Sequence, residues 1–460
     1  MTIRLYDSKA QALVDFVPLT ADKVGIYVCG PTVQSSPHIG HLRSALVYDL
    51  WRRWFNYRSF DVTLVRNVTD IDDKVLDNAT DDEPWWALAY RMELEFTAGY
   101  TALGIQPPTY EPRATASIPQ MIEIIQRLID AGHAYAAEGD VYFDTASWPA
   151  YGELTRQRPE NMEAATDADP RGKRDPRDFA LWKGAKPTEP VTARWESPWG
   201  AGRPGWHIEC SAMSSRYLGA AFDIHGGGLD LRFPHHENEL AQSTAAGDPF
   251  ASYWVHNGLV NVNGQKMSKS LGNSVYAADL LGRAQPIVVR YFLGSAHYRS
   301  TIDYHDGSLA EAEAALDRIG TFLTRSAASH TAAEQIPDAF AAAMDDDLSV
   351  PAALGVLHET VRAGNAALDA GDADAVASAR GAVLAMSEVL GINPLSPQWG
   401  AAASEPTELA LASLVESLIS DRNAARANKD FAVADRIRDE LAAAGITVED
   451  GAGGTHWSLQ

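Results

Sequence analysis

Cysteine is scarce in this sequence: among 460 residues the only two are Cys29 and Cys210. Two cysteines cannot form the disulfide framework of a small secreted domain, and their scarcity fits a reducing compartment. There is also no uninterrupted apolar run of about 18 residues, so we expect no membrane-spanning helix. Residues 1–19 lack a basic start followed by an apolar block, so we expect no export signal. These absences predict a cytoplasmic protein without membrane association.

Two common nucleotide-binding motifs are missing as well. No GxGxxG follows a predicted strand and no GxxxxGK[ST] occurs, which argues against dinucleotide and P-loop sites. Positive charge is in deficit, because 38 Lys and Arg stand against 61 Asp and Glu and give a net charge of −23. This balance argues against a nonspecific nucleic-acid coat protein. It still allows a nucleic-acid enzyme with a local basic surface.

Apolar residues make up 46% of the chain and charged residues 22%, as in globular proteins. A predicted strand over residues 24–30 is followed by a helix starting near His38 and by a second strand over residues 60–65. This order predicts an α/β fold with a Rossmann-like parallel sheet. In such a sheet ligands bind at the carboxyl ends of the strands, where Cys29 and His38 lie.

The length predicts several domains, and changes of composition suggest their limits. The middle of the chain contains a charged, proline-rich and irregular stretch, and the last third shows helical periodicity. We therefore predict the two halves of a Rossmann-like domain around an insertion, a lysine-containing region, an α-helical bundle, a linker and a small α+β C-terminal module. Their ranges are 1–140 and 205–258, with 141–204 as the insertion, then 259–307, 308–392, 393–407 and 408–460.

A first candidate site combines both cysteines with an imidazole and a carboxylate. Cys29 ends a predicted strand, Cys210 closes the segment GWHIEC, and His235 and Glu239 share one helix face at a spacing of four. Two thiolates, an imidazole and a carboxylate can fill a tetrahedral zinc site. From the residues alone, the alternative stays open that both cysteines are small buried hydrophobic side chains.

A second candidate is the segment HIGH at residues 38–41. His38 and His41 at a helix start lie beside backbone N–H groups that favour an anion, and Gly40 lets a ligand approach the backbone. This arrangement can hold a triphosphate and stabilise charge that develops on its α-phosphate. An ordinary helix start with two surface histidines is the alternative.

Two further segments could bind a nucleotide. KMSKS at residues 266–270 offers the ammonium groups of Lys266 and Lys269 to one polyanion, unless it is simply a solvated basic loop. In GGGLD at residues 226–230, the glycines permit close approach of a ligand to the backbone. The carboxylate of Asp230 can accept both ribose hydroxyls, although glycine clusters usually mark turns.

In this order, the segments resemble those of the class I aminoacyl-tRNA synthetases, in which HIGH and KMSKS bracket ATP. The resemblance narrows to the cysteinyl-tRNA synthetases and runs from near residue 1 to the C-terminus. At Gln34 and Ser35 the sequence departs from the Tyr-Asp common in that family. The segments that carry the resemblance are YVCGPT (27–32), HIGH (38–41), NVTDIDDK (67–74), PGWHIEC (204–210), HGGGLDLRFPHHENE (225–239), KMSKS (266–270) and GAGGTHW (451–457).

The resemblance implies a cysteine–tRNA ligase. Such an enzyme activates L-cysteine with ATP, releases pyrophosphate, and transfers cysteine from the adenylate to the 3′ end of tRNA(Cys). It implies one Zn²⁺ per chain, held by Cys29, Cys210, His235 and Glu239, which selects the substrate thiol so that no editing is needed. It also implies Mg²⁺ with ATP, and a monomer.

The resemblance further assigns roles to residues and domains. The two Rossmann-like segments would be catalytic, region 259–307 would contact the tRNA stem, and the helical bundle and terminal module would bind tRNA. The catalytic residues would be His38, His41, Lys266 and Lys269, joined in ATP binding by Gly40, Gly228 and Asp230. Substrate binding is expected at Cys29, Gly30, Thr32, Thr69 and Trp206, and anticodon binding at Arg436, Arg438, Asp450 and Trp457.

Two rival functions can be weighed on the same residues. A mycothiol-type ligase, which passes cysteine to a small amine, should lack the terminal anticodon module, and this chain continues to Gln460. A non-catalytic zinc- and RNA-binding relative should carry a broken HIGH or KMSKS, and both are intact. Both rivals are therefore disfavoured.

Overall fold

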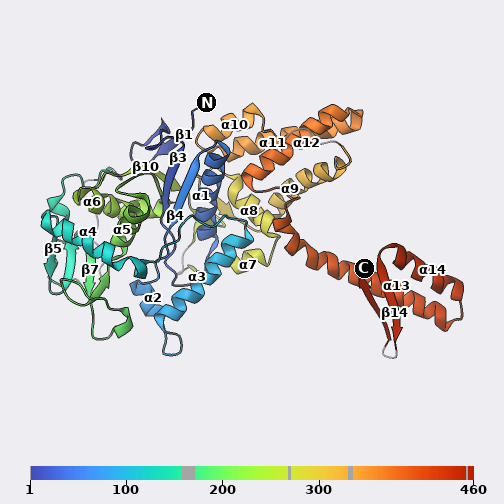
Figure 1. The fold of residues 1–460 in the computed structure, drawn as a ribbon, viewed down its shortest axis with the longest axis horizontal. Helices are drawn as coiled ribbons and strands as arrows, with labels where there is room; N and C mark the ends of the chain where they lie inside the picture. The colour runs from blue at the N-terminus through green and yellow to red at the C-terminus, as the bar shows by residue number, and fades with distance from the viewer. Residues whose placement is uncertain (1, 158–170, 268–270, 330–334, 452–453, 460) are drawn as a thin grey trace. The chain divides into compact units, whose positions relative to one another are not determined.

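The computed structural model describes residues 2–157, 171–267, 271–329, 335–451 and 454–459. The chain divides into two compact units, Met1–Pro394 and Leu395–Gln460, whose folds are drawn in Figure 1. Within the described ranges, no helix is both long and apolar enough to cross a lipid bilayer.

A four-stranded parallel sheet forms the centre of the first unit, in the order β10-β9-β3-β4. Its strands are β3 (Lys23–Val28), β4 (Asp61–Arg66), β9 (Ala221–Gly228) and β10 (Phe250–Asn257). Short runs of apolar and β-branched residues predicted β3 and β4 from the sequence. The predicted Rossmann-like parallel sheet is thereby confirmed.

The direction in which successive strands are added to the sheet reverses between β3 and β9. From β3 the chain goes outward to β4 on one side, and the later pair β9 and β10 extends the sheet on the other side. Helix α1 (Ile39–Tyr57) follows β3, lies beside the sheet in Figure 1 and buries Leu42, Leu46 and Trp54. Ligands of open parallel sheets bind at such a switch point. The candidate site of this chain is at this place.

The stretch predicted as irregular contains regular structure. Strands β6 (Asp140–Phe143), β7 (Phe179–Gly184) and β8 (Gly202–Pro204) join β5 (Ala134–Ala137) in an antiparallel sheet. The prediction missed β7 because its six residues, FALWKG, lie close to charged and proline-rich sequence. The insertion thus contributes ordered strands to a sheet whose first strand, β5, precedes residue 141.

The other elements of the first unit surround these two sheets. The helices are α2 (Asp73–Asn78), α3 (Trp85–Ala102), α4 (Ile118–Asp130), α5 (Trp206–Leu218), α6 (Glu237–Ala245), α7 (Ala277–Leu281) and α8 (Pro286–Ser295). The remaining strands are β1 (Arg4–Asp7), β2 (Ala12–Asp15), β11 (Val260–Val262), β12 (Gln265–Lys266) and β13 (Ile302–Tyr304).

The predicted helical region after residue 308 consists of α9 (Ser308–Arg325), α10 (Asp338–Asp345), α11 (Val350–Ala370) and α12 (Ala373–Leu390). Arg290 on α8 connects this region to α1, because its guanidinium forms a buried ion pair with Asp49 on α1 at 2.7 Å. The same guanidinium donates to the carbonyl of Leu390 at 2.9 Å. Helices α1, α8 and α12 are therefore held together by one buried side chain.

The second unit contains α13 (Gly400–Ala427), α14 (Phe431–Ala443) and the hairpin of β14 (Ile446–Gly451) and β15 (Gly454–Leu459). The α+β prediction for the terminal module is confirmed. The linker 393–407 stays a prediction, and within it α13 begins at Gly400. Alanine and glutamate favour a helix in this segment despite its proline.

Candidate active site

The four predicted zinc ligands come together at the carboxyl ends of the central strands. Cys29 directly follows β3, Cys210 lies on α5, His235 lies in the turn Arg232–His236, and Glu239 lies on α6. One ligand atom from each lies within 4.8 Å of those of the other three, and all four residues are buried.

Distances within this group are those of direct polar contact. The sulfur of Cys29 lies 3.7 Å from that of Cys210 and 3.2 Å from Oε1 of Glu239. The same Oε1 lies 3.0 Å from Nε2 of His235. A single carboxylate oxygen therefore faces both a thiol and an imidazole.

Burial and mutual contact set the protonation of the group. Burial and the hydrogen bond with Cys210 raise the pKa of Cys29 well above its usual value. Burial also opposes ionisation of Cys210, but its hydrogen bonds with Cys29 and His235 outweigh burial and lower the pKa of Cys210 to about 6. Against the same burial, the charge of Glu239 raises the pKa of His235 to about 10. Cys210 is thus the thiol that ionises first.

This donor set fits Zn²⁺. Two sulfurs, an imidazole nitrogen and a carboxylate oxygen are ligands that zinc prefers. Thiolate and carboxylate charges buried this closely repel one another, and a divalent cation would remove that repulsion. The geometry thus supports zinc over a purely hydrophobic role for the cysteines.

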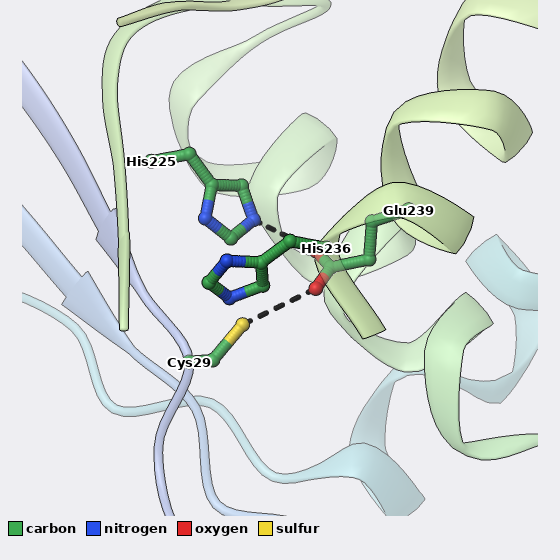
Figure 2. A group of neighbouring side chains, drawn as sticks. All are labelled: Cys29, His225, His236 and Glu239. Carbon is green, nitrogen blue, oxygen red and sulfur yellow. Dashed lines mark hydrogen bonds and ion pairs between the residues drawn. The ribbon is translucent and has the colours of Figure 1, made fainter. Parts of the chain in front are cut away.

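Four more histidines lie near these ligands, and no role was predicted for them from the sequence. His207 and His235 meet through their Nδ1 atoms at 2.8 Å, and His236 and His256 also meet at 2.8 Å. His225 contacts Glu239 at 2.8 Å. Figure 2 shows His225, His236, Cys29 and Glu239, a second group whose ligand atoms lie within 4.8 Å of one another. The sequence offered one signal for such a histidine: His207 precedes Cys210 by three positions and so shares its helix face.

The histidines of HIGH lie at the start of α1. Their ring centroids are 3.6 Å apart and stacked, and the backbone N–H of His38 donates to Nδ1 of His41 at 3.2 Å. Burial, and then the proximity of His38, lowers the pKa of His41 well below its usual value. His41 is therefore neutral at pH 7 with its proton on Nε2, where it can donate to an anion.

The start of α1 is also linked to the segment that follows KMSKS. Ile39 donates its backbone N–H to the carbonyl of Val275, and Ala277 donates to that of Pro37, both at 2.9 Å. A Cβ atom on Gly40 would lie 3.7 Å from the methyl carbon of Met267. Lys266 is exposed in β12, whereas Lys269 falls on residues 268–270, outside the described ranges.

Four of the five expected substrate-binding residues lie in the loops after β3 and β4. The N–H of Gly30 donates to Oδ1 of Asn67 at 2.8 Å, and Thr32 pairs with Thr69 in a parallel bridge. A Cβ atom on Gly30 would lie 1.7 Å from the carbonyl oxygen of Asn67, so only glycine fits there. Trp206 lies on α5 with its ring centroid 4.2 Å from that of His235, which places it beside the metal-ligand group.

Gly228 and Asp230 lie at the carboxyl end of β9. Gly228 is the last residue of that strand, and a Cβ atom there would lie 2.4 Å from Oδ1 of Asp230. Asp230 is exposed in the short turn Leu229–Leu231. Its carboxylate is thus available at the sheet edge where a nucleotide is expected.

Comparison with known proteins decides the family. Residues 15–314 match the family described as tRNA synthetases class I (C) catalytic domain, and residues 410–457 match the cysteinyl-tRNA ligase anticodon binding domain. A cysteine–tRNA ligase of Leifsonia xyli subsp. xyli is 70% identical, with 100% of both chains covered. One from Clavibacter michiganensis subsp. michiganensis is 69% identical over 100% of this chain and 99% of that protein.

The chain belongs to the cysteine–tRNA ligase family.

Similarity at the level of the fold extends to other synthetases. A methionyl-tRNA synthetase of Mycobacterium tuberculosis, solved with methionyl-adenylate, has a TM-score of 0.56 at 17% identity and covers 81% of this chain and 90% of its own. The LeuRS-tRNA-LeuAMS complex of Agrobacterium radiobacter K84 has a TM-score of 0.58 at 12% identity, covering 82% and 84%. Residues 339–394 of this cysteine–tRNA ligase family member also match the DALR domain.

In this family member, the expected anticodon-binding residues lie in the second unit. Arg436 and Arg438 are exposed on α14, and each contacts an acidic neighbour, Glu440 at 3.7 Å and Asp435 at 3.3 Å respectively. Asp450 belongs to β14. Trp457 packs against the small core of the unit and retains an intermediate exposure.

Proposed function

We propose that the chain is a cysteine–tRNA ligase. It activates L-cysteine with ATP and transfers it to the 3′ end of tRNA(Cys). The observation that carries this proposal is the buried group of Cys29, Cys210, His235 and Glu239, with ligand atoms within 4.8 Å of one another. It lies in a chain that matches the family's relatives along its whole length.

Cys29, Cys210, His235 and Glu239 would hold one Zn²⁺. When bound, zinc would supply a soft Lewis acid that binds a thiol as its thiolate and thus favours cysteine over serine. An apolar pocket alone discriminates such close analogues by only about 10–200-fold. The proposed enzyme therefore needs no editing site. Trp206 and the loops that contain Gly30, Thr32 and Thr69 would enclose the substrate.

Adenylate formation is a displacement at the α-phosphate of ATP. The substrate carboxylate attacks phosphorus, the bond to the bridging oxygen breaks, and pyrophosphate leaves. Mg²⁺ would accompany the phosphates and offset their charge. His38, Gly40 and His41 at the start of α1 would bind the phosphates, since backbone N–H groups there attract anions. The neutral His41 donates from Nε2 to the charge that develops, Lys266 and Lys269 bind pyrophosphate, and Gly228 with Asp230 holds the ribose.

The second half of the chain would bind tRNA. We assign residues 1–140 and 205–258 to catalysis, 259–307 to KMSKS and stem contact, and 308–392 to tRNA binding. Residues 408–460 would bind the anticodon, and the match at residues 410–457 supports this assignment. The charge of Arg436 and Arg438 suits phosphates, and an aromatic face such as that of Trp457 suits an unstacked base.

The enzyme would act as a monomer in the cytoplasm. The rival function, transfer of cysteine to a small amine, is not favoured, because an anticodon-binding match is present. A non-catalytic role is equally disfavoured by the catalytic-domain match over residues 15–314.

Pyrophosphate exchange with each amino acid in turn tests the proposal. We expect exchange with cysteine alone, and loss of that exchange after treatment with a zinc chelator. Restoring Zn²⁺ should restore it. Exchange with serine at a comparable rate, or exchange that is indifferent to removal of zinc, would contradict the proposed function.

A further inference from the structure

Glu239 divides its two carboxylate oxygens between two sets of partners. Oε1 faces Cys29 at 3.2 Å and His235 at 3.0 Å. Oε2 contacts Nε2 of His225 at 2.8 Å. The dashed lines in Figure 2 show the contacts of Glu239 with Cys29 and with His225. In the described part of the chain, no other side chain is hydrogen-bonded to Oε2.

The ring of His225 is fixed in its orientation by neighbours on several sides. It stacks on Trp254 with centroids 4.5 Å apart and 14° between the planes, and its centroid lies 5.4 Å from that of Tyr27. The ring of His236 lies 4.6 Å away. His225 itself is fully buried. Nε2 therefore points to Glu239 because of packing as well as through the hydrogen bond.

The other ring nitrogen indicates which tautomer is present. Nδ1 of His225 is buried, and the described residues offer it no hydrogen-bond partner. A buried N–H without an acceptor is costly, whereas the contact of Nε2 with a carboxylate requires a proton. The proton therefore belongs on Nε2, and His225 donates to Oε2.

We propose that His225 is a positioning residue that holds one oxygen of Glu239, so that Glu239 offers only Oε1 to a metal bound by the group. This inference rests on the proposed function, in which the substrate thiol must reach the same metal. A carboxylate that offers both oxygens would compete with the thiol, because catalytic zinc sites keep a position open for substrate. His225 would thereby act on the binding of cysteine while touching neither cysteine nor ATP.

Substitutions of His225 can separate its hydrogen-bond donation to Glu239 from the packing of its ring. The amide nitrogen of glutamine can take the place of Nε2, whereas that of asparagine is too short to reach Oε2. His225→Gln should therefore keep the hydrogen bond and His225→Asn should lose it. His225→Phe keeps a ring against Trp254 and has no donor, so it should behave as His225→Asn does.

The test uses the full-length chain with Co²⁺ in place of zinc. Cysteine is added stepwise, and the thiolate-to-metal absorption band measures its binding. For His225→Asn and His225→Phe we expect one metal per chain, as in the wild type. Half-saturation should require about 10–100-fold more cysteine, the range typical when a partner of a metal ligand is lost. The KM for cysteine in pyrophosphate exchange should rise likewise, with a smaller effect on kcat, and His225→Gln should lie within a few-fold of wild type.

Each contrary result has a distinct meaning. Wild-type affinity for cysteine in either donor-free variant would overturn the inference while leaving the proposed function intact. Loss of folding in both donor-free variants would also overturn it, because the contact would then serve stability. A wild-type Co²⁺ protein that does not respond to cysteine would contradict the proposed function itself.

Discussion

Cys210 differs from Cys29 although the two thiols touch. Both are buried, but only Cys210 is hydrogen-bonded to His235 as well as to the other thiol, which lowers its pKa to about 6. Burial and the hydrogen bond with Cys210 keep the pKa of Cys29 high. The first negative charge of the pair therefore belongs to Cys210. A cation that enters the group would meet this thiolate and the carboxylate of Glu239.

Substituting Cys210 should abolish the metal site without disturbing α5. In Cys210→Ser a hard hydroxyl replaces a thiolate, and zinc prefers the soft sulfur. We expect loss of bound zinc and a fall of more than about 100-fold in cysteine-dependent pyrophosphate exchange. Metal analysis and exchange assays measure both effects. Ser215→Ala on the same helix serves as the control, and full zinc content in Cys210→Ser would refute the assignment.

At the scale of elements, the structure shows which strands and contacts can be predicted from the sequence. Strands β3 and β4 were predicted because buried parallel strands are short apolar runs. Strand β7 was not, because a single six-residue strand beside charged sequence gives no periodicity. The role of His225 was also missed, since it pairs with Glu239, 14 positions away on another element. Such pairings depend on how elements pack together.

One contact between elements concerns Asp73, the first residue of α2. Its carboxylate bonds Lys183 of β7 at 2.6 Å and also Arg203 of β8. Burial raises the pKa of Asp73, but these two cations outweigh it and hold the pKa at about 2. The ion pairs connect α2 to the antiparallel sheet of the insertion.

The Asp73 contact should make stability depend on pH in a defined direction. The pKa is about 2 in the folded chain and about 3.9 when unfolded, so the stabilisation is complete above pH 4 and is lost as pH falls toward 2. After a discount for solvent screening, the stabilisation from the Asp73 ion pairs amounts to about 1–2 kcal/mol. The difference in free energy of unfolding between wild type and Asp73→Asn should have this size at pH 7 and shrink below pH 4. Urea denaturation across this range measures it, and a difference that grows on acidification would refute it.

At the scale of the whole molecule, the chain separates catalysis from the proposed anticodon recognition. The site residues of the first unit all precede Pro394, and Leu395–Gln460 forms a second unit with its own small core of Val415, Ile419, Ile437, Leu441 and Ile446. Net charge is −23, so attraction to RNA must come from local groups of lysine and arginine. Because the two units are linked, a tRNA bound to one unit has a raised effective concentration at the other.

Removal of Leu395–Gln460 should therefore affect the two half-reactions differently. We expect cysteine-dependent pyrophosphate exchange to stay within a few-fold of the full chain, because the catalytic group lies in the first unit. Aminoacylation at subsaturating tRNA should fall by about 100-fold or more as the linked contact is lost. Parallel assays on the two proteins measure this split. An equal loss in both reactions would contradict it.

The spacing of the metal-ligand group along the chain has a consequence for synthesis. Cys29 and Glu239 are 210 positions apart, and domains fold as their last residues leave the ribosome. The thiol of Cys29 is thus present in the nascent chain long before its three companions. During that interval it depends on the reductants of its surroundings, so oxidative stress would damage newly made chains before it damages mature enzyme.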